Sequence, residues 1–177
     1  KENLPKAIVL VHFAGYAKDL EKIKKLSIKY RFKIIEDASH ALGAKYKGGY
    51  IGNCKFSDVC VFSFHPVKSI TTGEGGMTTT RNKLLYKEML KLRNHGFDIR
   101  KNSKNKNYNW KNILLSNSLN FRLNDIQSAL GISQIKKLNK WKKIRNKIAA
   151  RYIRAFKNLP IDYQVQKKGI ISSYHLF

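Results

Sequence analysis

Two apolar segments separated by a helix-like segment constrain the fold of this chain most strongly. Residues 7–13 form a nearly unbroken apolar run rich in branched side chains, which is typical of a strand buried on both faces. Residues 33–37 form a second such run, and apolar side chains recur at helical spacing through residues 19–30 between the two. This order predicts a βαβ unit with parallel strands and a right-handed crossover.

Later segments extend the sheet and cover it. Residues 58–64 predict a third, buried strand and residues 76–80 a fourth, while residues 82–94 predict a helix. Residues 124–156 predict one long helix, broken or bent near its middle, that begins with a capping box. We therefore expect the α/β class, with a mostly parallel sheet and flanking helices.

The remaining segments are less regular. Residues 102–117 are polar and asparagine-rich without periodicity, and they predict an exposed loop whose Trp110, Leu114 and Leu115 tuck against another part of the protein. Pro160 stops the long helix, and one or two strand-like fragments follow it. We expect residues 1–137 to be part of a large domain, and residues 138–177 to be a connecting helix and the start of a small domain.

The pattern also predicts that this chain is an internal piece of a larger protein. The sheet opens without a preceding phosphate-binding loop, and the last strand-like fragment ends in mid-pattern. We expect such a piece to be inactive and poorly soluble by itself, because its sheet would expose apolar surface.

A net charge of +25 argues for a polyanion partner such as nucleic acid. The basic residues are mostly lysines spread among asparagines, and no zinc finger, RNA-binding strand or recognition helix accompanies them. We therefore favour compositional drift and expect no nucleic-acid partner, while a non-catalytic polyanion-binding domain stays open as the alternative.

Composition also bears on location and on metals. No run approaches the roughly 18 to 20 apolar residues of a membrane span, so we expect no membrane segment. Two cysteines, Cys54 and Cys60, fit a reducing cytoplasm better than a disulfide framework. The five histidines show no ligand spacing, so we expect no metal site.

Two residues at strand ends carry the strongest chemical signal. Asp37 closes the second predicted strand, and Lys68 follows the third just after Pro66. Enzymes that use pyridoxal phosphate need a carboxylate to keep the pyridine nitrogen protonated and an amine to hold the cofactor as a Schiff base. Asp37 alone also suits a turn cap, and Lys68 alone is one lysine among many.

Further polar residues accompany this pair, each with a structural alternative. Ser63 suits a phosphate contact or a strand-end hydrogen bond, and His40 suits a cofactor ring contact or a buried structural role. Asn120 and Arg122 suit a phosphate contact or a helix cap. Residues 71–76 suit a flexible backbone near a cofactor or a plain turn, but they are not a Walker A loop.

Four motifs in this order resemble the DegT/DnrJ/EryC1/StrS sugar aminotransferases. They are EDASHALG at residues 36–43, FSFHPVKSITTGEGG at residues 62–76, LRNHG at residues 92–96 and NFRLNDIQSALG at residues 120–131. The sequence around Lys68 is most similar to that of family members that act on a UDP-linked 4-keto-6-deoxy-N-acetylhexosamine on the way to pseudaminic acid.

The resemblance implies a fold-type I pyridoxal phosphate-dependent transferase that works as a homodimer. Lys68 would carry the cofactor, Asp37 would pair with the pyridine nitrogen, and His40 would lie near the ring. Ser63 would bind the cofactor phosphate, and Asn120 would reach the phosphate of the neighbouring subunit's cofactor. Lysine at position 68 favours transamination over dehydration.

The expected reaction transfers an amino group from an amino acid, by resemblance L-glutamate, to a nucleotide-linked keto-deoxy sugar. This chemistry serves the biosynthesis of surface polysaccharides or nonulosonic acids. Another keto sugar of the same family is the alternative substrate.

Overall fold

The computed structural model describes residues 4–97, 114–164 and 166–177. Its contacts divide the chain into two compact units. One unit combines Lys1–Arg81 with Asp125–Phe177, and the other is Asn82–Asn124. The two units are described separately below.

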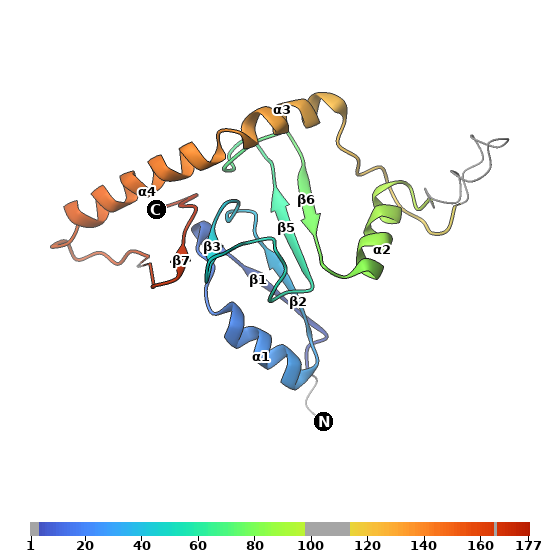
Figure 1. The fold of residues 1–177 in the computed structure, drawn as a ribbon, viewed down its shortest axis with the longest axis horizontal. Helices are drawn as coiled ribbons and strands as arrows, with labels where there is room; N and C mark the ends of the chain where they lie inside the picture. Colours follow the sequence, from blue (N-terminus) through green and yellow to red (C-terminus); the bar gives the residue numbers. More distant parts are fainter. Residues whose placement is uncertain (1–3, 98–113, 165) are drawn as a thin grey trace. The chain divides into compact units, whose positions relative to one another are not determined.

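A four-stranded sheet forms the centre of the first unit, in the order β1-β2-β5-β6. Strands β1 (Ala7–Val11), β2 (Lys33–Asp37) and β5 (Val59–Ser63) run parallel, and β6 (Gly76–Thr79) pairs antiparallel with β5. Figure 1 shows the arrows of β5 and β6 pointing in opposite directions. The predicted α/β class with a mostly parallel sheet is confirmed.

Burial separates the two faces of this sheet. Strand register places Ile34, Glu36, Cys60 and Phe62 on one face, where each is at most 6% exposed. The opposite face carries Val9 and Val11, which are 63% and 54% exposed, and Val61, which is 37% exposed.

The prediction that residues 7–13 are buried on both faces is therefore wrong for the described chain, and the predicted buried strand at residues 58–64 is buried on one face. Only one face packs against the core cluster, which includes Tyr16, Ala38, Ala41 and Ile51 from the segments between the strands. A continuous apolar run shows that both faces suit burial, but it does not show which face a given segment covers.

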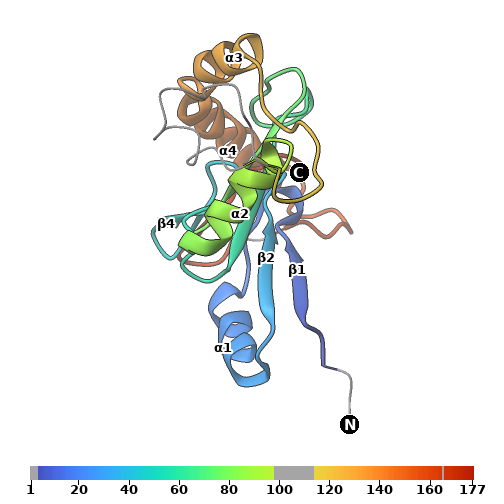
Figure 2. The same cartoon turned by 90° about the vertical axis from the view of Figure 1, so that its right-hand side faces the viewer.

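The helices of this unit follow the predicted segments. Helix α1 (Leu20–Tyr30) lies beside β2 in both views (Figures 1 and 2). The long C-terminal helix is broken as expected, into α3 (Asp125–Ile135) and α4 (Leu138–Ala155). The predicted domain boundary after residue 137 falls at this break, and it stays a prediction.

A second, three-stranded sheet links the segment after β2 to the end of the chain. Strands β3 (Lys45–Tyr46), β4 (Gly49–Tyr50) and β7 (Ile170–Ile171) pair antiparallel in the order β4-β3-β7. Strand β7 corresponds to a predicted C-terminal fragment, whereas β3 and β4 were not predicted. A 3-10 turn, η1 (Phe13–Gly15), follows β1.

The second unit contains α2 (Lys83–Arg93), which matches the predicted helix and begins at the capping side chain of Asn82. His95 and Phe97 bond to the segment that starts at Leu114. Most of the predicted loop, Trp110 included, lies outside the described residues. Leu114 and Leu115 are 57% and 48% exposed, so neither is tucked away in the described structure.

No helix within residues 4–97, 114–164 and 166–177 is long and apolar enough to cross a membrane.

Candidate active site

Asp37 is the last residue of β2, at the carboxyl edge of the parallel strands, where open α/β sheets bind ligands. Its Oδ1 accepts hydrogen bonds from the backbone N–H of Ser39 at 3.0 Å and from the Ser39 hydroxyl at 2.6 Å. Partial burial raises the pKa of Asp37, but these two bonds and the charges of His40 and Lys68 outweigh it and lower the pKa overall. Asp37 is therefore an ionised carboxylate at neutral pH.

A buried pair anchors this end of β2. The Nε2 atom of His12 lies 2.6 Å from Oε2 of Glu36, and both side chains are at most 3% exposed. The backbone N–H of His12 also donates to the carbonyl of Asp37 at 2.9 Å. His12 therefore holds both the side chain of Glu36 and the backbone carbonyl of Asp37.

His40 lies close to Asp37, in the loop after β2. Its ring is 5.8 Å from the ring of Phe13 and 4.3 Å from that of His175, centroid to centroid. The backbone N–H of Ala14 donates to Nδ1 of His40 at 3.3 Å, which favours the tautomer with the proton on Nε2. Burial and the charge of Lys68 lower the pKa of His40, while Asp37 raises it in part, so the ring is neutral at pH 7.

Lys68 lies half-buried in the loop between β5 and β6. Its backbone N–H donates to the carbonyl of His65 at 2.9 Å. The glycine-rich end of this loop bonds to itself and to Phe64, through the hydroxyls of Thr71 and Thr72. These contacts favour the interpretation of residues 71–76 as a turn, which holds Lys68 at the carboxyl edge of the sheet.

Lys68 interacts electrostatically with Asp37 and His40. The charge of Lys68 lowers the pKa of both other groups, so its amine is within electrostatic reach of each. The structure thus brings together three residues that the sequence indicated, from two different strand ends.

Ser63 and Asn120 differ from these three. Ser63 lies on the same face of the sheet as Asp37, and its hydroxyl accepts a hydrogen bond from the backbone N–H of His65 at 3.3 Å. Asn120 belongs to the second unit, where its side chain accepts from the N–H of Arg122 at 3.1 Å.

The structure adds two residues that sequence reasoning did not select for this site. His175 packs on His40, and burial together with the charges of His40, Lys68 and Arg145 lowers the pKa of His175 to about 4. Arg145 of α4 donates through Nη1 to the carbonyls of Tyr174 and His175 at 3.3 and 3.2 Å. Neither residue belongs to a motif with a recognisable spacing, so the sequence offered no signal for them.

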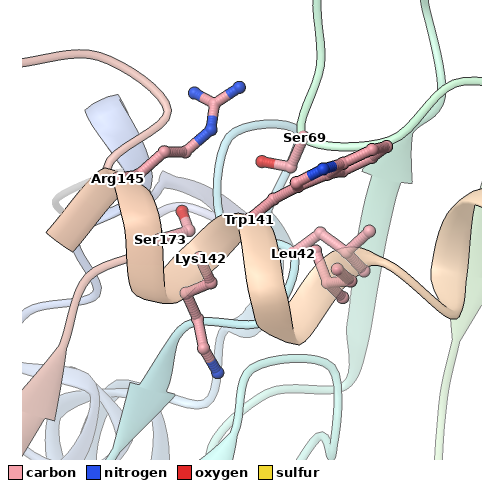
Figure 3. A pocket seen from close by; sticks show the side chains of 7 residues that line it. Leu42, Ser69, Trp141, Lys142, Arg145 and Ser173 are labelled. Atoms are coloured by element: carbon pink, nitrogen blue, oxygen red, sulfur yellow. The ribbon is translucent and has the colours of Figure 1, made fainter. Parts of the chain in front are cut away.

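A cavity of about 350 Å³ opens next to Lys68. Pro66, Lys68 and Ser69 of the loop line one side of it, and Trp141 and Arg145 of α4 line the other. A narrower crevice adjoins it, and Figure 3 shows Trp141 and Arg145 projecting from α4 on the side of Ser69, while Lys142 points the opposite way.

These residues fit pyridoxal phosphate. An ionised carboxylate suits a protonated pyridine nitrogen, an imidazole ring suits the face of the cofactor, and a lysine amine suits its aldehyde. The described residues contain no cluster of three or more histidine, cysteine or acidic side chains that would hold a metal ion.

Comparison with known proteins also indicates similarity to aminotransferases. The family model described as the DegT/DnrJ/EryC1/StrS aminotransferase family matches residues 2–177. A UDP-4-amino-4,6-dideoxy-N-acetyl-beta-L-altrosamine transaminase from Campylobacter jejuni is 40% identical over 172 residues, which is 97% of this chain and 43% of that protein.

Two solved structures are also similar. PseC from Helicobacter pylori, an aminotransferase of pseudaminic acid biosynthesis, is 38% identical with a TM-score of 0.85 over 96% of this chain and 44% of its own. A putative sugar aminotransferase, Spr1654 from Streptococcus pneumoniae, in its PMP form, is 27% identical with a TM-score of 0.88 over 97% of this chain and 48% of its own. The chain thus spans less than half the length of these relatives.

Proposed function

This chain belongs to the DegT/DnrJ/EryC1/StrS aminotransferase family, and on that premise we propose the activity of the full-length protein. It is a pyridoxal phosphate-dependent aminotransferase that moves an amino group from an amino acid, L-glutamate, to a nucleotide-linked keto-deoxy sugar. The observation that carries this proposal is the ionised carboxylate of Asp37 at the carboxyl edge of the sheet, held by Ser39, with the charge of Lys68 within electrostatic reach.

Each residue of the site has a role in this proposal. Bound pyridoxal phosphate supplies an electron sink for the carbon that carries the transferred nitrogen. Asp37 keeps the pyridine nitrogen protonated, because its own pKa is lowered and it remains anionic. The Lys68 amine would hold the cofactor and would serve as the base and acid that moves a proton at the substrate carbon. His40 would contact the cofactor ring, and Ser63 would bind the phosphate.

The proposal extends to the assembly and to the domains. The protein would be a homodimer in which Asn120 would bind the phosphate of the neighbouring subunit's cofactor. Residues 1–137 form part of the large cofactor-binding domain, and residues 138–177 lead into a smaller domain. We place the enzyme in the cytoplasm, where nucleotide-linked sugars are available to it.

The substrate in this proposal is a UDP-linked 4-keto-6-deoxy-N-acetylhexosamine. The names of two relatives support this choice. The Campylobacter jejuni protein is a UDP-4-amino-4,6-dideoxy-N-acetyl-beta-L-altrosamine transaminase, and the Helicobacter pylori protein is an aminotransferase of pseudaminic acid biosynthesis. A GDP-perosamine synthase from Escherichia coli, 32% identical over 172 residues, makes a GDP-linked keto sugar the candidate to test against it.

The test uses the full-length protein loaded with pyridoxal phosphate. We expect an absorbance band near the visible edge that disappears on borohydride reduction, and peptide mapping that finds the reduced cofactor on Lys68. With L-glutamate, the protein should aminate the UDP-linked keto sugar faster than a GDP-linked one. Mapping to another lysine, such as Lys55 or Lys91, would contradict the assignment.

A further inference from the structure

We propose that the cavity beside Lys68 is a subsite for the carboxylate of the amino donor, with Arg145 as its anchor and the Ser69 hydroxyl as a second hydrogen-bond donor. This inference rests on the proposed function, because it assigns a substrate group to a place in the same site. Four features of the cavity support it.

The first feature is charge. Lys68 and Arg145 are the ionisable side chains that line the cavity, and the described residues contribute no acidic side chain to it. Trp141 and Ile144 supply an apolar wall. A basic cavity with an apolar wall favours a small ligand that has both an anionic group and an aliphatic part, as an amino acid does.

The second feature is an unpaired hydroxyl. Ser69 is 8% exposed, and its Oγ is buried with no hydrogen-bond partner among the residues that the structure describes. A buried polar atom without a partner is costly, so a ligand oxygen that accepted a hydrogen bond from Ser69 would remove that cost. Figure 3 shows this oxygen on the side from which Arg145 and Trp141 approach.

The third feature is the fixed guanidinium. Arg145 holds the carbonyls of Tyr174 and His175 through Nη1, and these are the hydrogen bonds found for it among the described residues. A guanidinium fixed at one nitrogen keeps the rest of its planar fork in one orientation, which suits two-point binding of a carboxylate.

The fourth feature is size and position. A volume of about 350 Å³ is at the lower end of the roughly 300 to 1,000 Å³ typical of small-molecule sites. It favours an amino acid over a whole nucleotide-linked sugar. The α-carboxylate of a donor lies one carbon from its amine, so a carboxylate anchor must share a cavity with Lys68, as Arg145 does.

The experiment measures binding of glutarate, which is glutamate without its amino group, to the full-length protein by isothermal titration calorimetry. We expect Arg145→Gln to weaken glutarate binding on the order of tenfold or more, because it removes a charge-assisted contact. Arg145→Lys keeps the charge without the planar fork, so its affinity for glutarate should lie between those of the wild type and Arg145→Gln. Lys143→Gln, an exposed charge change on the same helix, should bind as the wild type does.

Ser69→Ala gives a signature that a purely structural role would not give. It should weaken glutarate binding several-fold and raise the melting temperature of the ligand-free protein, because an unpaired buried hydroxyl is removed. A lower melting temperature with unchanged glutarate binding would make Ser69 structural and would contradict its role here.

A second arm separates the donor from the sugar nucleotide. If Arg145→Gln weakens binding of UDP but leaves glutarate binding unchanged, the cavity serves the diphosphate and the inference is overturned. A wild-type protein without a borohydride-sensitive absorbance band would instead overturn the proposed function. A normal band together with unchanged glutarate binding in Arg145→Gln overturns the inference alone.

Discussion

The two faces of the four-stranded sheet have different tasks although they share the same strands. One face buries Ile34, Cys60 and Phe62 against the core. The other leaves Val9 and Val61 exposed in the described chain, and the residues placed in the cofactor site, Asp37 and Ser63, belong to it. Successive strand residues point to opposite faces, so stability and chemistry alternate along the backbone. Substitutions on the two faces should therefore have separable effects.

The largest expected effect on activity comes from Lys68, in the loop that follows β5. Lys68→Ala should abolish transamination and the borohydride-sensitive band of the full-length protein, because no amine remains to hold the cofactor. Lys55→Ala, which removes an exposed lysine from another loop, is the matched control and should retain both. Residual covalent cofactor in the Lys68→Ala protein would show that another amine does this work.

Asp37→Asn tests the chemical face without removing the amine. Turnover should fall by several orders of magnitude, because a neutral pyridine is a poor electron sink. The free energy of unfolding should change by about 1 kcal/mol or less, since the amide is isosteric and Asp37 is only partly buried. Steady-state kinetics and urea unfolding measure the two quantities, and near-normal turnover would return Asp37 to a turn-capping role.

Phe62→Ala tests the buried face. Phe62 is 6% exposed, so its truncation should lower the free energy of unfolding by about 3 to 5 kcal/mol. The activity per folded molecule should stay near the wild-type value. Val61→Ala, one residue away on the other face, should cost less stability in urea unfolding, and equal costs would end the distinction between the faces.

The smallest expected effect is a pH dependence that comes from His175. Its pKa is lowered to about 4, so between that value and the ordinary histidine value of about 6.5 the unfolded chain binds a proton that the folded chain does not. Stability should therefore fall as pH drops through this window. Urea unfolding at pH 7 and pH 5 should show a smaller loss in His175→Asn, whereas His65→Asn, an exposed control, should lose as much as the wild type.

The sequence predicted the parallel strands from short, nearly unbroken apolar runs. It predicted the helices because periodicity over ten or more residues records which face of a helix is apolar. It did not predict β3 and β4, since strands of two residues have no period to detect. It also assigned burial to both faces of β1, because apolar character does not record which segment covers a strand.

The same limits apply to the site. Asp37 and Lys68 stand at the ends of apolar runs, so local pattern was enough to select them. His175 and Arg145 reach the site through packing on α4 and through backbone bonds such as that of His175 to Ala14. Such contacts depend on the docking of distant segments, and no local spacing encodes them.

One of those distant contacts has a consequence in time. Gly15 lies so close to Ser173 and to the His40 carbonyl that a Cβ there would overlap both, and the Ser173 hydroxyl donates to that carbonyl across 133 residues of sequence. At a synthesis rate of roughly 5 to 20 residues per second, a growing chain makes Ser173 about 7 to 27 seconds after His40. Throughout that interval the first strands can pair, but the segment with Ser173 and His175 that packs on His40 has not yet been synthesised. A nascent chain therefore exposes its cofactor residues before it can enclose them.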